Sequence, residues 1–216
     1  MVLSNGPCRF GPPFRGISHQ EKQDQRAGQT GCQCLPLPPK ARMQSKTPDD
    51  SLTILTEIVL PNDTNNLGNL FGGQLLSWMD RSAAIAAHRH CKRIVVTASV
   101  NNVSFAQPIP QGAIVTLEAR VSRAFSSSME VFVDVYIEDQ TLAGKKIKAN
   151  EAIYTFVAVD QLGNPISVPA LIPQTEVQKK RYEGALRRKQ LALILGGKMD
   201  PQEATELKKL FLGEEA

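Results

Sequence analysis

The apolar positions of this chain change their period along its length. Over residues 73–90 they recur every three or four positions, which predicts one long helix with an apolar face. The members of that face are Leu75, Leu76, Met79, Ala83, Ala86 and Ala87. Over residues 129–138 apolar residues alternate with others, which predicts a strand with one buried face. The small alanines of the helix would let a sheet pack closely against it.

Four more segments have the composition of strands, and two further segments near the end of the chain read as helices. The strands are predicted at about 52–60, 95–105, 114–123 and 146–159, and the helices at 174–195 and 200–212. A strand, a helix and then strands in succession indicate an α+β fold, in which an antiparallel sheet wraps around the long central helix. The last two helices, rich in Lys, Arg, Glu and Leu, would form a surface appendage or a partner contact.

The chain has 216 residues and 42% hydrophobic content, enough for one sizeable core. Residues 1–50 are rich in Pro, Gly, Gln and Ser without periodicity, so we expect them to form a disordered N-terminal extension. The folded domain is predicted over residues 51–165. A C-terminal helical extension is expected over residues 166–216.

A glycine-rich segment leads directly into the long helix. Residues 65–74 read NNLGNLFGGQ, and the helix that follows carries Asp80 two turns inside its apolar stretch. Gly72 and Gly73 would let a ligand approach the backbone closely, and the first amides of a helix have no internal partners. Such amides can hold an oxyanion or a phosphate. Taken alone, two glycines before a helix are more often a simple loop.

This segment resembles the signature of the acyl-CoA thioesterases of the hotdog fold. In that signature Asn-x-x-Gly-x-x-(Phe/His)-Gly-Gly leads into a helix with a Met-Asp or similar pair, here Met79 and Asp80. The resemblance continues through the predicted strands and covers roughly residues 51–165 in the right order. It implies a hydrolase of lipid metabolism that releases a carboxylic acid and free coenzyme A. It implies no metal and no cofactor, because coenzyme A is part of the substrate.

The composition limits the partners of the protein. Lys and Arg exceed Asp and Glu by 25 to 21, and most of that excess falls in residues 1–50. The predicted domain therefore has no dense basic stripe for nucleic acid. No apolar run reaches the roughly 18 residues of a membrane span. Four scattered cysteines suit free thiols in a reducing compartment, so we expect a cytoplasmic protein without membrane insertion.

Three residues are the catalytic candidates. The amide of Gly73 or Gln74 at the helix start would stabilise the oxyanion of a tetrahedral intermediate. Asp80 would act as the base for water or as the direct nucleophile. Asn65 aligns with the catalytic asparagine of the family and would orient the water or the carbonyl. His88 and His90 lie on different faces of the helix, so we assign them to packing or solvent.

The spacing of the candidates along the helix indicates a composite site. Seven residues at about 1.5 Å each separate Gly73 from Asp80 by roughly 10 Å. One subunit is therefore not expected to bring both groups to one carbonyl. We expect Asn65 and Gly73 from one subunit and Asp80 from its partner in a homodimer, as the resemblance also implies. Assembly into a tetramer or hexamer stays open.

The resemblance also implies residues that bind the substrate, in addition to Gly72 and Gln74. Thr97 and Ser104 match positions that line the reaction centre of the family, although both could be ordinary sheet hydroxyls. Arg123 and the serines Ser126, Ser127 and Ser128 match a hairpin that contacts the nucleotide end of coenzyme A. Arginine suits a phosphate in geometry and charge. A serine-rich turn, however, needs no ligand.

Two other functions are compatible with the same fold. A hydroxyacyl dehydratase acting on acyl-carrier-protein substrates uses a histidine near the helix start together with an acid. The segment 61–73 of this chain has no histidine, which weighs against that activity. A non-catalytic acyl-CoA-binding protein would keep the cleft without turnover. The joint presence of Asn65, Gly73 and Asp80 argues against it.

Overall fold

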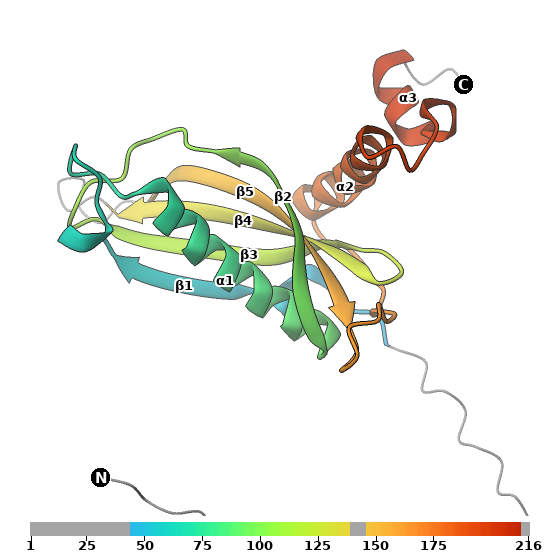
Figure 1. The fold of residues 1–216 in the computed structure, drawn as a ribbon, viewed down its shortest axis with the longest axis horizontal. Helices are drawn as coiled ribbons and strands as arrows, with labels where there is room; N and C mark the ends of the chain where they lie inside the picture. Colours follow the sequence, from blue (N-terminus) through green and yellow to red (C-terminus); the bar gives the residue numbers. More distant parts are fainter. Residues whose placement is uncertain (1–43, 139–145, 213–216) are drawn as a thin grey trace, which may run out of the picture. The chain divides into compact units, whose positions relative to one another are not determined.

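The computed structural model describes residues 44–138 and 146–212, and in them a long helix lies across one face of a curled antiparallel sheet (Figure 1). Of residues 1–50, which we expect to be disordered, residues 1–43 lie outside the described residues. The strands are β1 (Thr53–Ile58), β2 (Ile94–Ser104), β3 (Ile114–Ala124), β4 (Ser128–Glu138) and β5 (Lys146–Val159). The helices are α1 (Gly72–Cys91), α2 (Glu176–Leu195) and α3 (Thr205–Leu212), with short 3₁₀ turns at Pro48–Ser51, Pro61–Asp63 and Pro201–Glu203. This is the α+β arrangement that the apolar periods predict.

The strand order explains why α1 lies across the sheet. The order is β1-β3-β4-β5-β2, and every neighbouring pair is antiparallel. The first two strands of the chain therefore form the two edges, and the connection between them must cross the sheet. Helix α1 is that connection.

The core lies between α1 and the inner face of the sheet. Met79, Ala83, Ala86 and Ala87 on α1 are fully buried, as their spacing predicts. Alanines at these positions bring the helix backbone close to the strands. On β4 the alternating valines at 131, 133 and 135 are buried against this helix. The short-range apolar periods therefore predicted the correct faces for both elements.

Helix α2 covers part of the outer face of the sheet through ion pairs with two buried carboxylates. Arg188 Nη2 lies 2.7 Å from Glu130 Oε1, and Arg181 Nη2 lies 2.8 Å from Asp134 Oδ2. The two carboxylates project from β4 away from α1 and are almost fully buried. Helix α2 is thus the C-terminal helical extension that the sequence predicts, and it covers charged groups that the sheet alone would leave in water.

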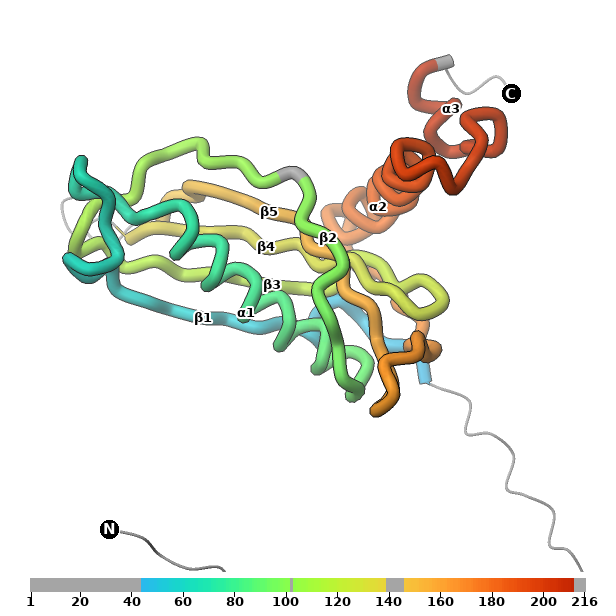
Figure 2. Tube along the Cα trace, in the orientation of Figure 1, coloured from blue at the N-terminus to red at the C-terminus, as the bar shows by residue number. Residues whose placement is uncertain are grey.

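The folded domain extends beyond both expected boundaries. After β5 the chain forms a strap whose Val168 and Leu171 are buried in the core, so the predicted end at residue 165 falls inside the core. Lys46 pairs with that strap as a parallel bridge, so the domain also begins before residue 51. Figure 2 traces the two segments lying side by side. The Lys46 Nζ atom donates to the carbonyls of Arg89 and His90, which are unpaired at the end of α1.

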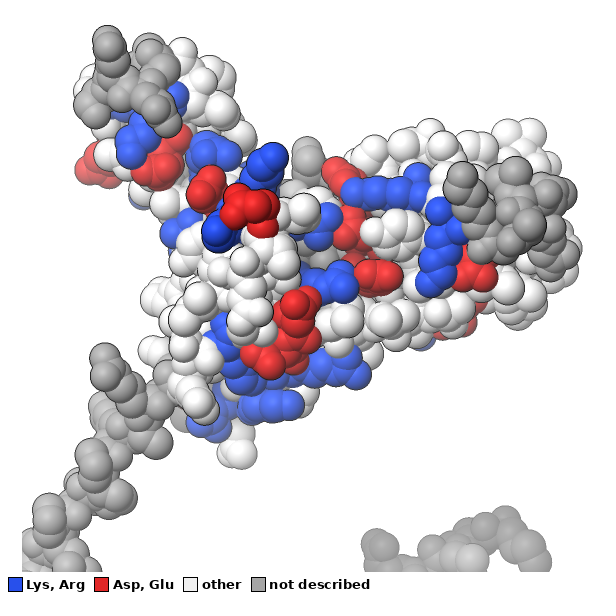
Figure 3. All heavy atoms as spheres, turned by 180° about the vertical axis from the view of Figure 1, so that it is seen from behind, with Lys and Arg blue, Asp and Glu red and all other residues white. Residues whose placement is uncertain are grey.

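Among the described residues, the face turned away from the view of Figure 1 carries charges of both signs. Figure 3 shows Lys and Arg interspersed with Asp and Glu over that face, around α2 and the outer side of the sheet. In the described part of the chain, no helix is both long enough and apolar enough to cross a bilayer.

Candidate active site

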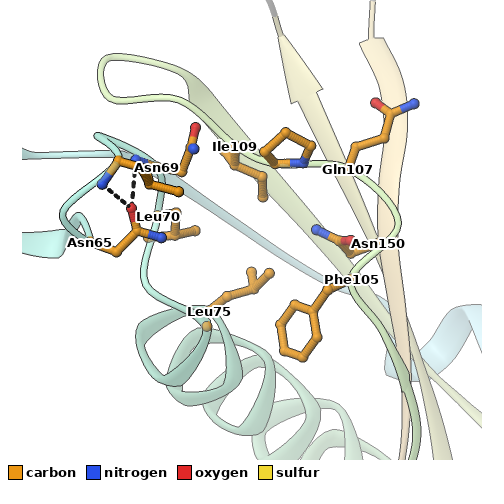
Figure 4. Close-up of a pocket in the computed structure, with 11 residues that line it drawn as sticks. Asn65, Asn69, Leu70, Leu75, Phe105, Gln107, Ile109 and Asn150 are labelled. Carbon is orange, nitrogen blue, oxygen red and sulfur yellow. Dashed lines mark hydrogen bonds between the residues drawn. The ribbon is translucent and has the colours of Figure 1, made fainter.

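Asn65 is fixed by the loop that precedes α1. Its Oδ1 accepts hydrogen bonds from the amides of Leu67 at 2.9 Å and Asn69 at 3.2 Å, a turn that asparagine favours. Gly68 within the turn has a φ of 71°, which suits glycine. The Asn65 oxygen is thus used by its own loop (Figure 4). Its amide nitrogen is the atom left to donate to a ligand carbonyl.

The first turn of α1 presents one glycine amide to the surface. The amides of Gln74 and Leu75 both donate to the carbonyl of Phe71, at 3.0 and 3.1 Å. The amide of Gly73 has no hydrogen-bond partner among the described residues. A Cβ at this position would lie 2.8 Å from the Phe71 ring, so any side chain here would push that ring aside. Of the two amides expected as oxyanion donors, Gly73 is the one available.

Asp80 is held by a hydroxyl from the neighbouring edge strand. Thr97 Oγ1 on β2 donates to Asp80 Oδ1 at 2.9 Å. The bond fixes one carboxylate oxygen and leaves the other to accept a proton from water or to attack a carbonyl. The sequence placed both residues near the reaction centre, but their direct contact joins elements that are far apart along the chain.

An open groove of about 510 Å³ runs beside this pair, and we call it the Asp80 groove. It is lined by Gly73, Leu76, Ser77, Asp80, Thr97, Val100, Val103 and Tyr154. Gly73 and Asp80 of one chain therefore border the same groove, two helical turns apart on α1. The walls are mostly apolar, which suits a ligand with an apolar part.

Sequence reasoning missed Tyr154, which forms part of the wall of the groove. Its ring is buried on β5, and its hydroxyl donates to the carbonyl of Leu76 at 3.2 Å. Burial, with the nearby charge of Asp80, raises the pKa of Tyr154, so the phenol stays protonated at neutral pH. No local pattern could have identified it, because it reaches the helix from a strand 78 residues away.

A second hollow of about 430 Å³ lies on the other side of the helix start, and we call it the Asn65 pocket (Figure 4). Asn65, Gly72, Leu75, Phe105 and Asn150 are among the residues that line it. Asp80 and Thr97 are not among them. In one chain, therefore, the asparagine and the aspartate face different hollows.

The residues expected to hold the coenzyme A nucleotide are not brought to either hollow. Arg123 Nη1 donates to the carbonyl of Tyr182 on α2 at 2.9 Å, and the guanidinium lies 4.1 Å from that ring. The carbonyls of Ser126 and Ser127 accept from the amides of Val168 and Ala158. The hairpin thus has structural partners of its own.

The other predicted binding residues Ser128, Ser104 and Gln74 also lie outside the lining of the Asp80 groove and the Asn65 pocket. Ser128 lines a separate hollow of about 380 Å³ between the sheet and α2, together with Arg188 and Lys189. Ser104 lies exposed at the end of β2, opposite Glu151 on β5. Gln74 lies in the first turn of α1, its amide bonded to Phe71.

The histidines and acids of the described residues do not form a metal site. Within residues 44–138 and 146–212 no three side chains of His, Cys, Asp or Glu converge in a way that would hold an ion. His90 is buried at the end of α1, and its Nε2 lies 2.8 Å from the carbonyl of Pro169. Burial lowers the pKa of His90. His88 is exposed, so both histidines have the packing and solvent roles that their positions predict.

The chain is similar in sequence to known proteins. Residues 67–143 match the family model described as the thioesterase superfamily. The chain is 43% identical over 139 residues to the uncharacterized acyl-CoA thioester hydrolase YkhA of Bacillus subtilis, covering 64% of this chain and 80% of that protein. It is 36% identical over 157 residues to the rat cytosolic acyl coenzyme A thioester hydrolase, covering 70% of this chain but 40% of that longer protein.

Solved structures share the fold over most of their length. An acyl-CoA hydrolase from Bacillus cereus is 36% identical with a TM-score of 0.68, over 77% of this chain and 98% of that one. The acyl-CoA hydrolase from Staphylococcus aureus, in complex with butyryl coenzyme A, coenzyme A and coenzyme A disulfide, is 37% identical with a TM-score of 0.66, over 71% and 94%. Variants of it replace an asparagine, an aspartate and a threonine by alanine. A further neighbour, 42% identical, is a hexameric acyl-CoA thioesterase.

Proposed function

Given that this chain belongs to the thioesterase superfamily, with the hotdog fold of the acyl-CoA hydrolases, we propose that it hydrolyses fatty acyl-CoA to a free carboxylic acid and coenzyme A. The observation that carries the proposal is the Asp80 groove. In it the Asp80 carboxylate is held by the Thr97 hydroxyl in a mostly apolar channel, where the Asn65 and Gly73 donors of a second subunit would meet it. No metal or cofactor enters the reaction, since coenzyme A arrives with the substrate.

The proposed reaction divides the work between donors and a carboxylate. The Gly73 amide and the Asn65 amide nitrogen donate to the thioester oxygen as it becomes negative, and one such donor contributes roughly 10²–10³ in rate. Asp80 removes a proton from water, whose oxygen then bonds to the carbonyl carbon while the carbon–sulfur bond breaks. The proton passes from Asp80 to the departing thiolate. A general base contributes about 10²–10⁴ in rate.

Direct attack by Asp80 is the alternative course of the same reaction. The carboxylate oxygen would bond to the carbonyl carbon, releasing the thiolate and leaving a mixed anhydride that water then hydrolyses. Thr97 serves either course, because its hydrogen bond fixes one carboxylate oxygen and so points the other along the groove.

The Staphylococcus aureus variants support these roles for three residues. The substituted aspartate of that protein follows its asparagine at the same interval as Asp80 follows Asn65. Its threonine follows the aspartate at the same interval as Thr97 follows Asp80. We therefore propose that Asn65, Asp80 and Thr97 of this chain form one reaction centre, with Gly73 as the backbone donor.

That reaction centre would be completed between two subunits. In one chain Asn65 lines the Asn65 pocket and Asp80 lines the Asp80 groove, so a single copy leaves them on different surfaces. A homodimer that brings the helix start of one copy to the Asp80 groove of the other would unite them. Hexameric neighbours are compatible with further assembly, and a dimer is the smallest unit that the proposal requires.

The hairpin at residues 123–128 and the cellular location remain to be assigned a role and a compartment. We propose that Arg123 and the serines 126–128 contact the nucleotide of coenzyme A from the hairpin, in a place that the second subunit helps to form. We also propose a cytoplasmic enzyme, in keeping with its match to cytosolic hydrolases.

A mixing experiment tests the composite site. Asn65→Ala and Asp80→Ala are each expected to lower hydrolysis of a panel of acyl-CoAs, followed with a thiol-reactive dye. When the two inactive proteins are dissociated and reassembled together, half of the dimers are mixed and one site in each is intact. About a quarter of the wild-type activity should therefore return. No recovery in reassembled mixed dimers would contradict a shared site, and undiminished activity of either single variant would contradict its role.

A further inference from the structure

The phenol of Tyr154 meets α1 at the turn that carries Asp80. Tyr154 lies on β5 and is 1% exposed, and its hydroxyl donates to the carbonyl of Leu76 at 3.2 Å. In an α-helix each carbonyl accepts from the amide four residues later, so the Leu76 carbonyl is also the acceptor of the Asp80 amide. One carbonyl oxygen therefore joins the phenol to the backbone of Asp80.

The core holds this phenol in a fixed place. Side chains alternate along β5, and those of Ala152, Tyr154 and Phe156 lie on the inner face that packs on α1. The rings of Tyr154 and Phe156 stack with their centroids 6.4 Å apart. A ring in a close-packed core has little freedom to move, so its hydroxyl is a fixed donor. Phenylalanine would fill nearly the same volume, so the packing alone does not account for the hydroxyl.

Asp80 is thus held by two neighbouring strands of the sheet. Thr97 on β2 bonds the carboxylate, and Tyr154 on β5 bonds the helical turn from which that carboxylate projects. The two strands pair with Thr97 opposite Phe156 and Val100 opposite Tyr154. Both bonds therefore refer Asp80 to the same part of the sheet. Such placement matters because a shift of about 1 Å in a reacting group can cost about 100-fold in rate.

Two features argue against a direct chemical role for Tyr154. Its side chain is almost completely buried, so a substrate in the Asp80 groove meets little of it. Burial, with the nearby charge of Asp80, raises the pKa of Tyr154, so the phenol keeps its proton and does not exchange it with a thiolate. The hydrogen bond to Leu76 is what remains for it to contribute.

We propose that Tyr154 is a positioning residue for the hydrolysis, and that it places Asp80 by holding the carbonyl of Leu76. The inference rests on the proposed function, in which Asp80 is the base or the nucleophile. Without the hydroxyl, the Leu76 carbonyl still accepts from the Asp80 amide, so the helix stays intact while its tie to β5 is lost. The turn can then shift, and the carboxylate reaches the thioester less often. Substrate binding, which uses the walls of the groove, is little affected.

Tyr154→Phe tests the inference, because it removes the hydroxyl and keeps the ring. The net contribution of a hydrogen bond between uncharged groups predicts a kcat about 3- to 10-fold lower, with KM within about twofold of wild type. Steady-state hydrolysis of one acyl-CoA by the purified full chain measures both constants. Tyr136→Phe is the matched control, since Tyr136 lies on the outer face of β4 and outside the lining of the Asp80 groove. It should keep both constants.

A double variant distinguishes positioning from a general effect on the fold. Thr97→Val already releases the carboxylate that Tyr154 helps to place. Adding Tyr154→Phe to Thr97→Val should therefore lower kcat by less than about twofold more, because two substitutions that act on one group are not additive. If the two effects multiply, Tyr154 acts independently of Asp80 and the inference is overturned.

The outcomes separate this inference from the function on which it rests. An unchanged kcat in Tyr154→Phe, beside a wild-type chain that hydrolyses acyl-CoA, would overturn the role of Tyr154 and leave the thioesterase proposal standing. No hydrolysis of any acyl-CoA by the wild-type chain would overturn both. The melting temperature of Tyr154→Phe should stay within about 5 °C of wild type. A variant that fails to fold would show that the hydroxyl serves the fold rather than the reaction, and would refute the inference.

Discussion

At the scale of single residues, the contact between Thr97 and Asp80 is the feature on which the proposed chemistry most depends. A carboxylate that rotates freely spends little time in a reactive orientation, and a hydrogen bond of 2.9 Å to one of its oxygens restricts it. The amide of Gly73 is fixed by the helix backbone. The carbonyl of Phe71 accepts from the amides of Gln74 and Leu75, so the Gly73 amide stays free to donate to a ligand. Donor and carboxylate are thus both prepared before the substrate binds.

Replacing Thr97 by valine tests that preparation, since valine has the same shape without the hydroxyl. Hydrogen bonds to charged groups contribute about 1.5–3 kcal/mol, so kcat should fall by about 10- to 100-fold with little change in KM. Steady-state hydrolysis of one acyl-CoA measures both constants. Thr56→Val, on the opposite edge strand, is the matched control, since its hydroxyl lies 3.4 Å from the hydroxyl of Thr116 on β3 and far from Asp80 along the sheet order. An unchanged kcat in Thr97→Val would remove Thr97 from the reaction centre.

At the scale of elements, α2 and the outer face of β4 depend on each other through charge. Glu130 accepts two hydrogen bonds from the Arg188 guanidinium, at 2.7 and 2.9 Å, and one from the Ser122 hydroxyl at 2.6 Å. Buried charges are tolerated only when paired in this way. A strand whose inner face packs on α1 and whose outer face carries carboxylates therefore needs α2 in place.

Removing one partner of this pair should destabilise the domain strongly. Arg188→Met leaves Glu130 buried and unpaired, and we expect the unfolding free energy to fall by about 3–5 kcal/mol in urea denaturation. Adding Glu130→Gln to the same chain should recover part of the loss, because the uncompensated charge is gone. Lys209→Met, which breaks the exposed pair with Glu206, should change stability by less than about 1 kcal/mol. Equal effects of the two single variants would show that the buried pair contributes no more than a surface one.

The end of α1 gives the domain a dependence on pH. Burial lowers the pKa of His90 below its ordinary value of 6.5. The unfolded chain then binds a proton that the folded chain does not, so stability is present above pH 6.5 and is lost as the pH falls towards the folded pKa. Urea unfolding measured from about pH 8 to about pH 5 should show a decline in the unfolding free energy. His90 contributes at most about 1.4 kcal/mol of this decline per pH unit. His90→Gln should make the decline smaller. Exposed His88→Gln should keep the wild-type slope, and an identical slope in all three proteins would contradict the role of His90.

At the scale of the whole molecule, the edge strand β2 has the features of a subunit interface. Ile94 and Val96 lie at alternate positions on this edge and are 55% and 47% exposed. Val100, beyond the register shift between Thr97 and Ser99, is 44% exposed beside the Asp80 groove. Apolar edges of this kind pair readily with another chain. The strand also supplies Thr97 to the Asp80 groove, so a partner seated along it would reach the reaction centre. Pairing there would explain how two copies complete one site.

A charge placed on this edge should separate the subunits and, by doing so, stop the reaction. Val96→Lys is expected to shift the protein to monomers in sedimentation equilibrium and to lower activity in proportion to the dimer lost. Ile54→Lys on the other edge strand, where Ile54 is 58% exposed, should keep the dimer and its activity. A fully active Val96→Lys monomer would exclude the composite site.

The sequence by itself determined the elements and the family. Helix α1, the alternating face of β4 and the order of the strands along the chain follow from apolar periods of a few residues, and the segment 65–80 carries its motif in one continuous stretch. These features are local, so the printed residues contain them completely. The same locality made Asn65, Gly73 and Asp80 identifiable as candidates before any contact was known.

Only the tertiary structure decided which of those candidates meet. The bond from Thr97 to Asp80 joins an edge strand to the helix, Tyr154 reaches Leu76 from 78 residues away, and Arg123 pairs with Tyr182 on α2. Side-chain contacts of this kind depend on strand register and helix placement, which arise from packing of the whole core and leave no local trace in the sequence.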